Sequence, residues 1–524
     1  IDGTTESPAR SVSAAVTLVL EPPQRDPGGD VESPPPRTDH FPTRPVIGAI
    51  IVSIALRARF ITTPLSVDEG GYLAVARAWA SGKSLYTQAW VDRPQGLLVL
   101  FRIWDDLTGG SAEAIRVMAI LFGCLAVAAV AYAVFAMAGA RAGAIAGFLV
   151  AVASANARIE GFIANGELLA GAVAATGVAA ACAYMFRGHR LRWLFVSGLL
   201  AGCAMSLKQS GFDGFAAVMI CLLVGGLTRE RRWREVLREC AVCFAGWASV
   251  AALLLLHGIA VGFSAWWYAL AGYRIGGLNA SDADWHRFGI TSRLAGPTIL
   301  PLAAAAVAGV IVWLARHPRI TRNRVLIPVW MCFATAAFLT GGLFHRHYWV
   351  TLTFPFAAAA AVAISKIKGH VGIAIAVATL TVIPSLISTA RVIVLDRAAV
   401  AIKAHNDPRL VVDERVARWY ADNRTRGSTL YALCSSAAMY ADADAIPPYP
   451  YLWLDGVQHG RGAQEKLVQL FAGDNPPTFV ARYQAVRVCN PSGEVGTLLN
   501  ERYRQVEDVD GAVIYELRDA VANG

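Results

Sequence analysis

Long apolar segments, separated by short loops rich in arginine, recur between residues 46 and 389 of the chain. The segment 239–263 alone is long enough to cross the hydrocarbon core of a bilayer as a helix. Inside lipid every backbone polar group must be hydrogen-bonded within the protein, so such segments cross as helices. With 55% apolar and 16% charged residues, the sequence predicts a polytopic α-helical membrane protein.

The loops between the apolar segments predict the orientation. Lysine and arginine gather in the loops around residues 141, 187–192, 229–238, 316–324 and 366–368, and these loops all fall on one side. By the positive-inside rule that side is cytoplasmic, which explains the net charge of +9 without nucleic acid. The sequence thus predicts a multi-pass plasma-membrane protein with a cytoplasmic N-terminus and an extracytoplasmic C-terminus. The eleven predicted spans are 46–63, 113–138, 143–157, 167–186, 192–207, 211–227, 239–263, 294–315, 325–343, 348–365 and 370–389.

Composition divides the chain into three parts. Residues 1–45 are rich in proline, serine and charge, and we expect a disordered cytoplasmic tail. Residues 46–390 form the transmembrane domain, whose external loop 64–112 carries two short apolar stretches, 72–82 and 96–109, that we expect to be interfacial helices.

Residues 391–524 are less apolar, and we expect a small external α/β domain. The stretch 413–424 has helical periodicity, and 428–434, 478–483 and 512–518 have the pattern of strands. Cys434 and Cys489 are the two cysteines of this part, and outside the cytoplasm they are able to form a disulfide.

Charged and polar residues of both signs lie on the predicted external side, at the edge of the membrane. Such residues are costly there unless they are solvated or paired. Their recurrence in loops far apart in sequence predicts an outward-facing polar cavity, with carboxylates to handle protons and cations to hold phosphate. Simpler interpretations remain open: Asp68 as an N-cap of a helix beginning near Gly70, residues 345–348 as an interfacial anchor, and Lys208 as a snorkelling lysine.

Four motifs, in this order, carry a family resemblance. They are VDEGGYLAVARAWASGKSLY (67–86), VDRPQGLLVLFRIW (91–104), ARIEGFIANGELL (157–169) followed by LKQSG (207–211), and FHRHYWVTLTFP (344–355). Over about residues 46–390 the chain resembles the GT-C superfamily of glycosyltransferases that use lipid-phosphate sugars. In particular it is similar to the bacterial, actinobacterial-like branch of the dolichyl-phosphate-mannose protein mannosyltransferase family.

The resemblance implies an inverting glycosyltransferase with a GT-C-like membrane domain. It implies that Asp68 is the catalytic base, that Glu69, Glu167 and Asn165 orient the acceptor, and that cations and donors surround the leaving phosphate. The implied phosphate-binding residues are Lys208, Arg346, His347, Tyr348 and Arg93.

The implied donor is a polyprenyl-phosphate sugar such as decaprenyl-phosphate mannose or arabinose, and the implied acceptor is a cell-envelope glycan or lipoglycan, with a protein acceptor still open. This chemistry requires no cofactor, and no cluster in the sequence argues for a metal, although a divalent ion stays open. Two other functions remain: a transporter or flippase for lipid-linked sugars, and a noncatalytic scaffold that binds wall glycans.

Overall fold

The computed structural model describes residues 40–275, 284–316, 319–367, 371–434 and 436–518. Most of the predicted N-terminal tail therefore lies outside the described residues, and its last residues belong to the first helix, α1 (Thr43–Ala58).

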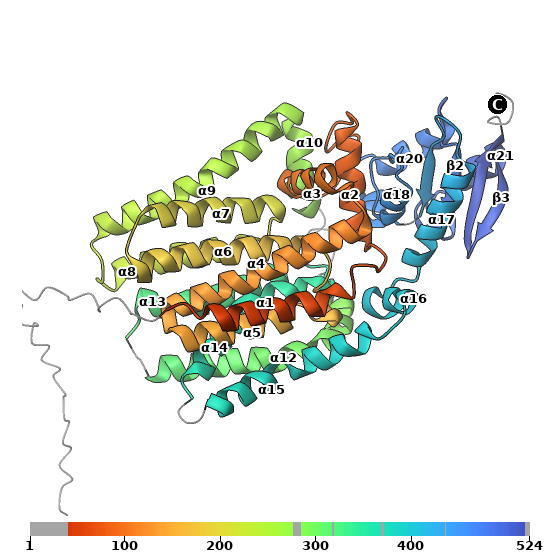
Figure 1. Ribbon diagram of the computed structural model, residues 1–524. Helices are drawn as coiled ribbons and strands as arrows, with labels where there is room; N and C mark the ends of the chain where they lie inside the picture. The colour runs from red at the N-terminus through yellow and green to blue at the C-terminus, as the bar shows by residue number, and fades with distance from the viewer. Residues whose placement is uncertain (1–39, 276–283, 317–318, 368–370, 435, 519–524) are drawn as a thin grey trace, which may run out of the picture. The chain divides into compact units, whose positions relative to one another are not determined.

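Each predicted span corresponds to a helix in the described part of the chain, and most of these helices lie side by side (Figure 1). Besides α1, they are α4 (Ala112–Ala138), α5 (Ala140–Ala153), α6 (Gly166–Arg187), α7 (Arg192–Leu207), α8 (Asp213–Leu227), α9 (Trp233–Val261), α12 (Trp285–Arg316), α13 (Arg322–Thr340), α14 (Trp349–Ser365) and α15 (Val371–Ile393). Among the described residues, seven helices are long and apolar enough to cross a membrane, and α5, α7 and α8 are shorter apolar helices. The chain is thus a multi-pass membrane protein.

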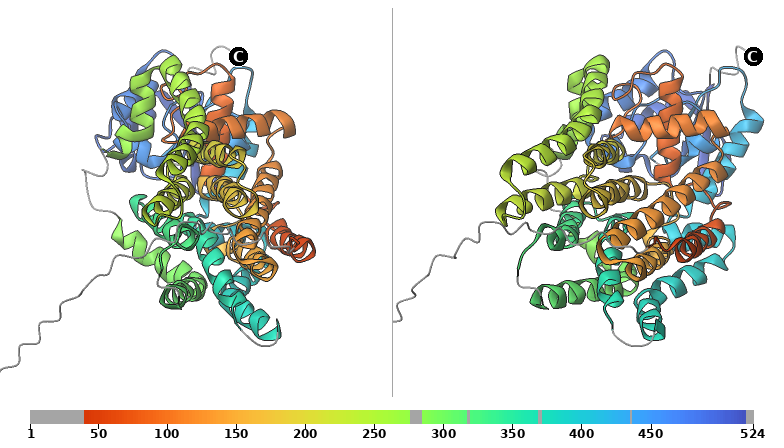
Figure 2. Two further views of the ribbon diagram at one scale, coloured as in Figure 1. Left: turned by 90° about the vertical axis from the view of Figure 1, so that its left-hand side faces the viewer. Right: turned by 60° about the vertical axis from the view of Figure 1, so that its left-hand side comes forward.

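The helices pack in two groups around a shared centre. α7 packs against both α6 and α9, while α12 packs against both α14 and α15. Figure 2 shows α7 and α9, in yellow to yellow-green, on one side and α12 and α15, in green and teal, on the other. α4, α6 and α14 lie between the two groups and contact one another.

Two short helices follow α1 in the loop 64–112, where two were expected. α2 (Val67–Ala80) packs against α3 (Gln95–Thr108), and α3 also contacts α4 and α7. α3 has one apolar face and begins after Pro94. Gln95 at its first position is buried, accepting from Trp266 Nε1 at 3.0 Å and donating to the carbonyl of Leu254 at 2.7 Å. A glutamine at this turn therefore ties α3 to α9 and to α10 (Phe263–Trp267).

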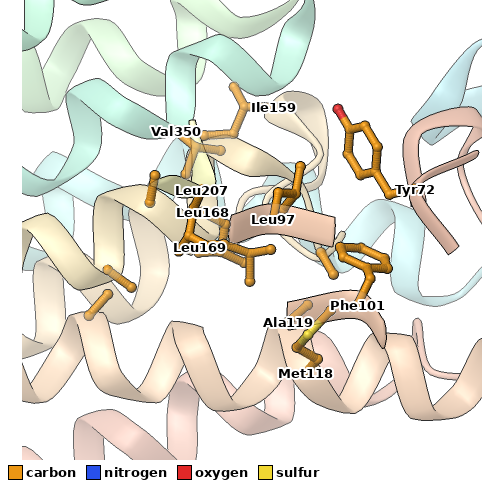
Figure 3. Close-up of a cluster of buried hydrophobic side chains, with 14 of the residues drawn as sticks. Tyr72, Leu97, Phe101, Met118, Ala119, Ile159, Leu168, Leu169, Leu207 and Val350 are labelled. Atoms are coloured by element: carbon orange, nitrogen blue, oxygen red, sulfur yellow. The ribbon is translucent and has the colours of Figure 1, made fainter. Parts of the chain in front are cut away.

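A buried apolar cluster lies where α2, α3, α4, α6 and α14 meet, as Figure 3 shows. Its labelled members are Tyr72, Leu97, Phe101, Met118, Ala119, Ile159, Leu168, Leu169, Leu207 and Val350. The rings of Tyr72 and Phe101 meet edge to face, with centroids 5.6 Å apart. The cluster fixes α2 on the bundle, and the ring of Tyr72 lies at its edge.

The C-terminal part is an α/β domain, as predicted. Its sheet has the strand order β1-β2-β4-β3, in which β1 (Leu430–Leu433) is parallel to β2 (Phe479–Arg482). β4 (Ala512–Leu517) pairs antiparallel with β2 and with β3 (Tyr503–Val509). β3 was not predicted, because its residues are mostly exposed and charged and give no apolar pattern.

Helices α17 (Arg409–Asn423), α18 (Ala438–Asp442), α19 (Leu454–His459), α20 (Ala463–Ala472) and α21 (Glu494–Arg502) complete the domain. Cys434 and Cys489 form a disulfide, with their Cα atoms 5.2 Å apart. α15 leads into the domain through α16 (Arg397–Val400) and the π-helical turn η4 (Ala401–His405).

Candidate active site

Asp68 lies in the first turn of α2. The sequence predicted that this helix begins near Gly70, a few residues after its observed start. The helix begins at Val67 and is capped by Ser66, whose hydroxyl accepts from the backbone N–H of Glu69 at 3.2 Å. The Asp68 carboxylate is therefore not needed as a cap and remains about one-fifth exposed. Its Oδ1 accepts a hydrogen bond from Trp453 Nε1 at 3.1 Å, and its Oδ2 lies 3.7 Å from His347 Nε2.

Two glycines directly after the acidic pair explain how Trp453 reaches Asp68. A Cβ added to Gly70 would lie 2.5 Å from the Cα of Ala438, and one added to Gly71 would lie 2.4 Å from the Trp453 ring. Only glycine permits this close packing of α2 on the C-terminal domain. The pair of glycines in the first motif was the sequence signal for this contact.

Glu69, which was expected to orient the acceptor, does not line the cavity beside Asp68. Its side chain is fully buried and lies 3.1 Å from Arg116 Nη2. It accepts from the backbone N–H groups of Ser66 at 3.0 Å and Ala164 at 2.7 Å. Glu69 therefore joins α2 to α4 and to the loop before α6.

His347 stands among three carboxylates. It belongs to the 3-10 turn η3 (Arg346–Tyr348) before α14. Its Nδ1 lies 3.1 Å from Glu160 Oε2, and its Nε2 lies 3.7 Å from Asp68 and 3.8 Å from Glu167. Such surroundings favour the positively charged imidazolium. His347 was expected to bind phosphate, and the structure places it beside the expected base instead.

Glu160 binds a second histidine, His405 of η4, whose Nδ1 lies 3.1 Å from Oε1. Burial raises the pKa of Glu160, but hydrogen bonds from His347 and His405 outweigh it and hold that pKa well below its usual range. Neither Glu160 nor His405 was among the expected site residues. Glu160 stands inside the third motif, whereas no local pattern marks His405.

Lys208 and Glu167 form a buried ion pair next to His347. Lys208 ends α7, and its Nζ lies 4.3 Å from the centre of the Tyr348 ring. Burial lowers the pKa of Lys208, and the negative charge of Glu167 partly offsets this effect by raising it. Two expected residues, Lys208 and Tyr348, are therefore brought together, with Glu167 as the counter-ion of the lysine.

A second ionic group lies near Lys208, since the neighbouring Gln209 donates to the carbonyl of Asp92 at 3.0 Å. Asp92 Oδ1 is 2.7 Å from Arg93 Nη1, and Arg274 pairs with the other carboxylate oxygen. Burial raises the pKa of Asp92, but the two arginines lower it to about 2. Arg93 Nε also donates to the hydroxyl of Tyr72 at 3.1 Å. Two arginines around one carboxylate leave a net positive charge at this wall.

Two other expected residues, Arg346 and Asn165, lie outside the linings of the two cavities described below. Arg346 donates to the backbone carbonyl of Ala404 at 2.7 Å and so holds η4. Asn165 is fully buried as the N-cap of α6, where its side chain accepts from the N–H of Leu168 at 2.9 Å.

Two cavities, of about 1250 and 530 Å³, open in the described part of the chain and share one wall. The larger contains Lys208 and Glu167, and the smaller contains Asp68, Glu160 and His347. Their common lining is Arg93, Tyr273, Arg274, Arg287, Leu343, Tyr348 and Asp455. Asp68 and Lys208 thus open onto adjoining spaces, although the acid lies in the smaller one.

Arg274, Arg287 and Trp453 complete the walls and were not expected as site residues. Arg274 and Trp453 stand in stretches whose charge or aromatic content the sequence does show. Their approach to Asp68 depends on packing between segments far apart in the chain. Among the described residues, no group of three or more His, Cys, Asp and Glu side chains is arranged to hold a metal ion.

Comparisons with known proteins place this geometry in a fold. No protein-family model matches the chain, and no curated protein matches it. The crystal structure of ArnT from Cupriavidus metallidurans is similar in the apo state, with a TM-score of 0.61, 14% identity, and coverage of 90% of this chain and 97% of that chain. The same protein bound to undecaprenyl phosphate is similar with a TM-score of 0.59, at the same identity and coverage.

The oligosaccharyltransferase of Archaeoglobus fulgidus, in complex with Zn and sulfate, is also similar. Its TM-score is 0.55 at 13% identity, covering 91% of this chain and 73% of that chain. At these identities the likeness establishes the fold alone. The chain has the GT-C membrane fold with a C-terminal domain, as the sequence predicted.

Proposed function

We propose that this chain, whose fold is that of GT-C membrane glycosyltransferases, transfers a sugar from a polyprenyl-phosphate donor to an acceptor hydroxyl. One observation carries the proposal: the exposed carboxylate of Asp68 opens onto a cavity that adjoins a second, cation-lined cavity beside Lys208. A base and a phosphate site in adjoining spaces are what transfer from a lipid phosphate requires.

The larger cavity suits the donor. Lys208, Arg93, Arg274 and Arg287 line it, and fixed cations stabilise the negative charge that develops on a leaving phosphate. Tyr348 is a hydrogen-bond donor in the shared wall. The apolar side chains that line the same cavity, and that suit an isoprenoid chain, are Phe212, Leu270, Trp285, Phe338 and Leu343.

The smaller cavity suits the acceptor hydroxyl. Its oxygen attacks the anomeric carbon, its proton passes to the carboxylate of Asp68, and the bond from that carbon to the phosphate oxygen breaks. The bonding electrons leave with the polyprenyl phosphate, whose charge the cations of the larger cavity balance. A single displacement of this kind inverts the anomeric centre. Protonated Asp68 then returns its proton to the water of the cavity.

The finer assignment is part of the same proposal. The sugar is mannose or arabinose carried on decaprenyl phosphate, and the acceptor is a cell-envelope glycan or lipoglycan. The chain lies in the plasma membrane with its N-terminus in the cytoplasm and its C-terminal domain outside. The arginine-rich loops support this orientation, since they follow the predicted cytoplasmic ends of the spans.

The test uses the purified full-length protein in lipid nanodiscs with a panel of synthetic polyprenyl-phosphate sugars and glycan acceptors. We expect release of free polyprenyl phosphate together with a glycosylated acceptor. Asp68→Asn should lower kcat at least about 100-fold, because general-base catalysis contributes about 10²–10⁴-fold. Asp106→Asn removes an exposed carboxylate of α3 and is the matched control.

Two results contradict the proposal. Full transfer by folded Asp68→Asn protein removes the base from the mechanism. Movement of intact donor across the membrane of a sealed vesicle, with no cleavage by any acceptor, identifies a flippase instead.

A further inference from the structure

Glu160 is held between two histidines by an unusual piece of backbone. It lies in the left-handed region, with φ 54° and ψ 34°, directly after the 3-10 turn η1 (Ala157–Ile159). A residue other than glycine is rarely found in this region, and such conformations gather at functional sites. The next residue is fixed as well, because the carbonyl of Gly161 accepts from Arg57 Nε at 2.9 Å. The loop thus holds the Glu160 carboxylate in place.

We propose that Glu160, held between His347 and His405, is a positioning residue that keeps His347 charged and turned toward Asp68. The inference rests on the proposed function, since it assigns the support of the base in that reaction. His347 in this state is the counter-ion of Asp68, the carboxylate that accepts the proton in that reaction.

The groups around His347 agree with this role. Asp68 of α2, Glu160 after η1 and Glu167 of α6 face it from three elements, at 3.1–3.8 Å. The opposing neighbour is His345, whose ring is stacked on that of His347 with centroids 5.4 Å apart. Burial and the charge of His347 lower the pKa of His345 to about 3, so His345 is neutral and adds no competing charge.

Glu167 does not supply the same support as Glu160. It is shared with Lys208, which pairs with it directly, and it lies 3.8 Å from His347 Nε2, whereas Glu160 lies 3.1 Å from Nδ1. Glu160 has two histidines and no direct lysine or arginine partner among the described residues. Arg116 and Arg346 approach it only at longer range. Glu160 is therefore the carboxylate that holds the His347 ring by a hydrogen bond and adds its charge to those of Glu167 and Asp68.

His405 extends this support to the C-terminal domain. It ends η4, the turn through which α15 leads into that domain, and Arg346 binds the carbonyl of the preceding Ala404. The orientation of Glu160 therefore depends on the position of η4 in the linker between the two domains. His405 is a second positioning residue, one step further from Asp68.

The pH dependence follows from these charges. When Glu160 is replaced by glutamine, the imidazolium of His347 loses its nearest counter-ion and gives up its proton at lower pH. Above that pH, Asp68 faces a neutral ring in place of an imidazolium. The alkaline limb of the pH–rate profile therefore shifts down by about one to three pH units, the usual effect of one adjacent charge.

The experiment compares wild type with Glu160→Gln, Glu160→Asp and the control Glu501→Gln, an exposed glutamate of α21. Donor cleavage is measured from pH 5 to pH 9 in nanodiscs. For Glu160→Gln we expect kcat to fall about 10-fold or more, with the donor KM within about 3-fold, and a narrowed profile. Glu160→Asp keeps the charge and should restore the width of the profile.

A second measurement does not depend on activity. The ring nitrogens of ¹⁵N-histidine-labelled protein are followed by NMR from pH 5 to pH 9, with His347 assigned through His347→Gln. The His347 ring should lose its proton at lower pH in Glu160→Gln than in wild type. Unchanged titration of that ring, or an unchanged profile in folded Glu160→Gln protein, overturns the inference. Absence of transfer by wild type overturns the proposed function, while the NMR result still decides the role of Glu160.

Discussion

Replacement of Glu69 should lower the stability of the protein, whereas replacement of the adjacent Asp68 should abolish transfer and leave stability unchanged. Glu69→Gln is the sharper test of this difference. Glu69 and Arg116 are both buried, with side-chain exposures of 0% and 1%. Arg116 Nε and Nη1 have no hydrogen-bond partner among the described residues, so Glu69 carries most of the compensation for this buried charge. Arg116 Nη2 also donates to the carbonyl of Pro64 at 2.5 Å.

The size of the effect follows from what glutamine cannot replace. It offers one acceptor oxygen in place of two, so one of the backbone N–H groups of Ser66 and Ala164 loses its partner. Its amide donors face Arg116, which needs an acceptor. Removal of one member of a buried ion pair costs about 3–5 kcal/mol, because the other charge is left unpaired in a medium that does not solvate it. We expect a loss of about that size in the free energy of unfolding.

The assay is an SDS titration of the protein in mixed micelles, followed by tryptophan fluorescence, with Asp68→Asn as the neighbouring comparison. Asp68→Asn should retain near-wild-type stability and lose transfer activity. The double variant Glu69→Gln/Arg116→Met should recover part of the loss, because both buried charges are then absent. Wild-type stability of Glu69→Gln together with abolished transfer would refute the structural role of Glu69.

Two further predictions concern the cation wall and the C-terminal domain. Arg274→Gln should raise the donor KM about 10-fold or more, because it removes a charge-assisted contact worth about 1.5–3 kcal/mol. Arg346→Gln should leave the donor KM within about 2-fold, because Arg346 binds the Ala404 carbonyl. Steady-state kinetics with one donor measures both values, and equal effects of the two variants would contradict the assignment. Burial raises the pKa of Asp413 in α17 from 3.8 to about 7, although a hydrogen bond from Ser436 acts against this. At pH values between 3.8 and about 7, Asp413 is ionised in the unfolded chain but keeps its proton in the folded protein. The free energy of unfolding therefore falls as pH rises from 4 to 7, by an amount on the order of 4 kcal/mol. Asp413→Asn should remove this slope in unfolding curves recorded across that range, and an unchanged slope would show that Asp413 does not titrate as described.

The sequence predicted some, but not all, of the residues on which the catalytic assignment depends. Asp68, Lys208 and Tyr348 were expected at one site, and the structure places them around adjoining cavities. Arg346 and Asn165 were expected there too, yet both bind backbone. Residue type predicts what a side chain is able to do, but its direction from a turn depends on which neighbouring backbone groups need a partner.

The sequence by itself determined the helices, their order and the end of the bundle at which polar residues collect. These features depend on apolar length and loop charge, which are local properties of the chain. The strand β3 was not predicted from the sequence, because its mostly exposed residues show no apolar alternation.

Tertiary structure alone decided which carboxylate meets the cavity and which histidines face it. Asp68 and Glu69 are adjacent in sequence, but successive residues of a helix point about 100° apart, so one faces the cavity and the other faces Arg116. Trp453 and His405 come from beyond the last membrane helix. Trp453 reaches Asp68 because glycines at 70 and 71 let the C-terminal domain pack on α2. Contacts of this kind depend on the shape of surfaces far apart in the chain, which no local pattern records.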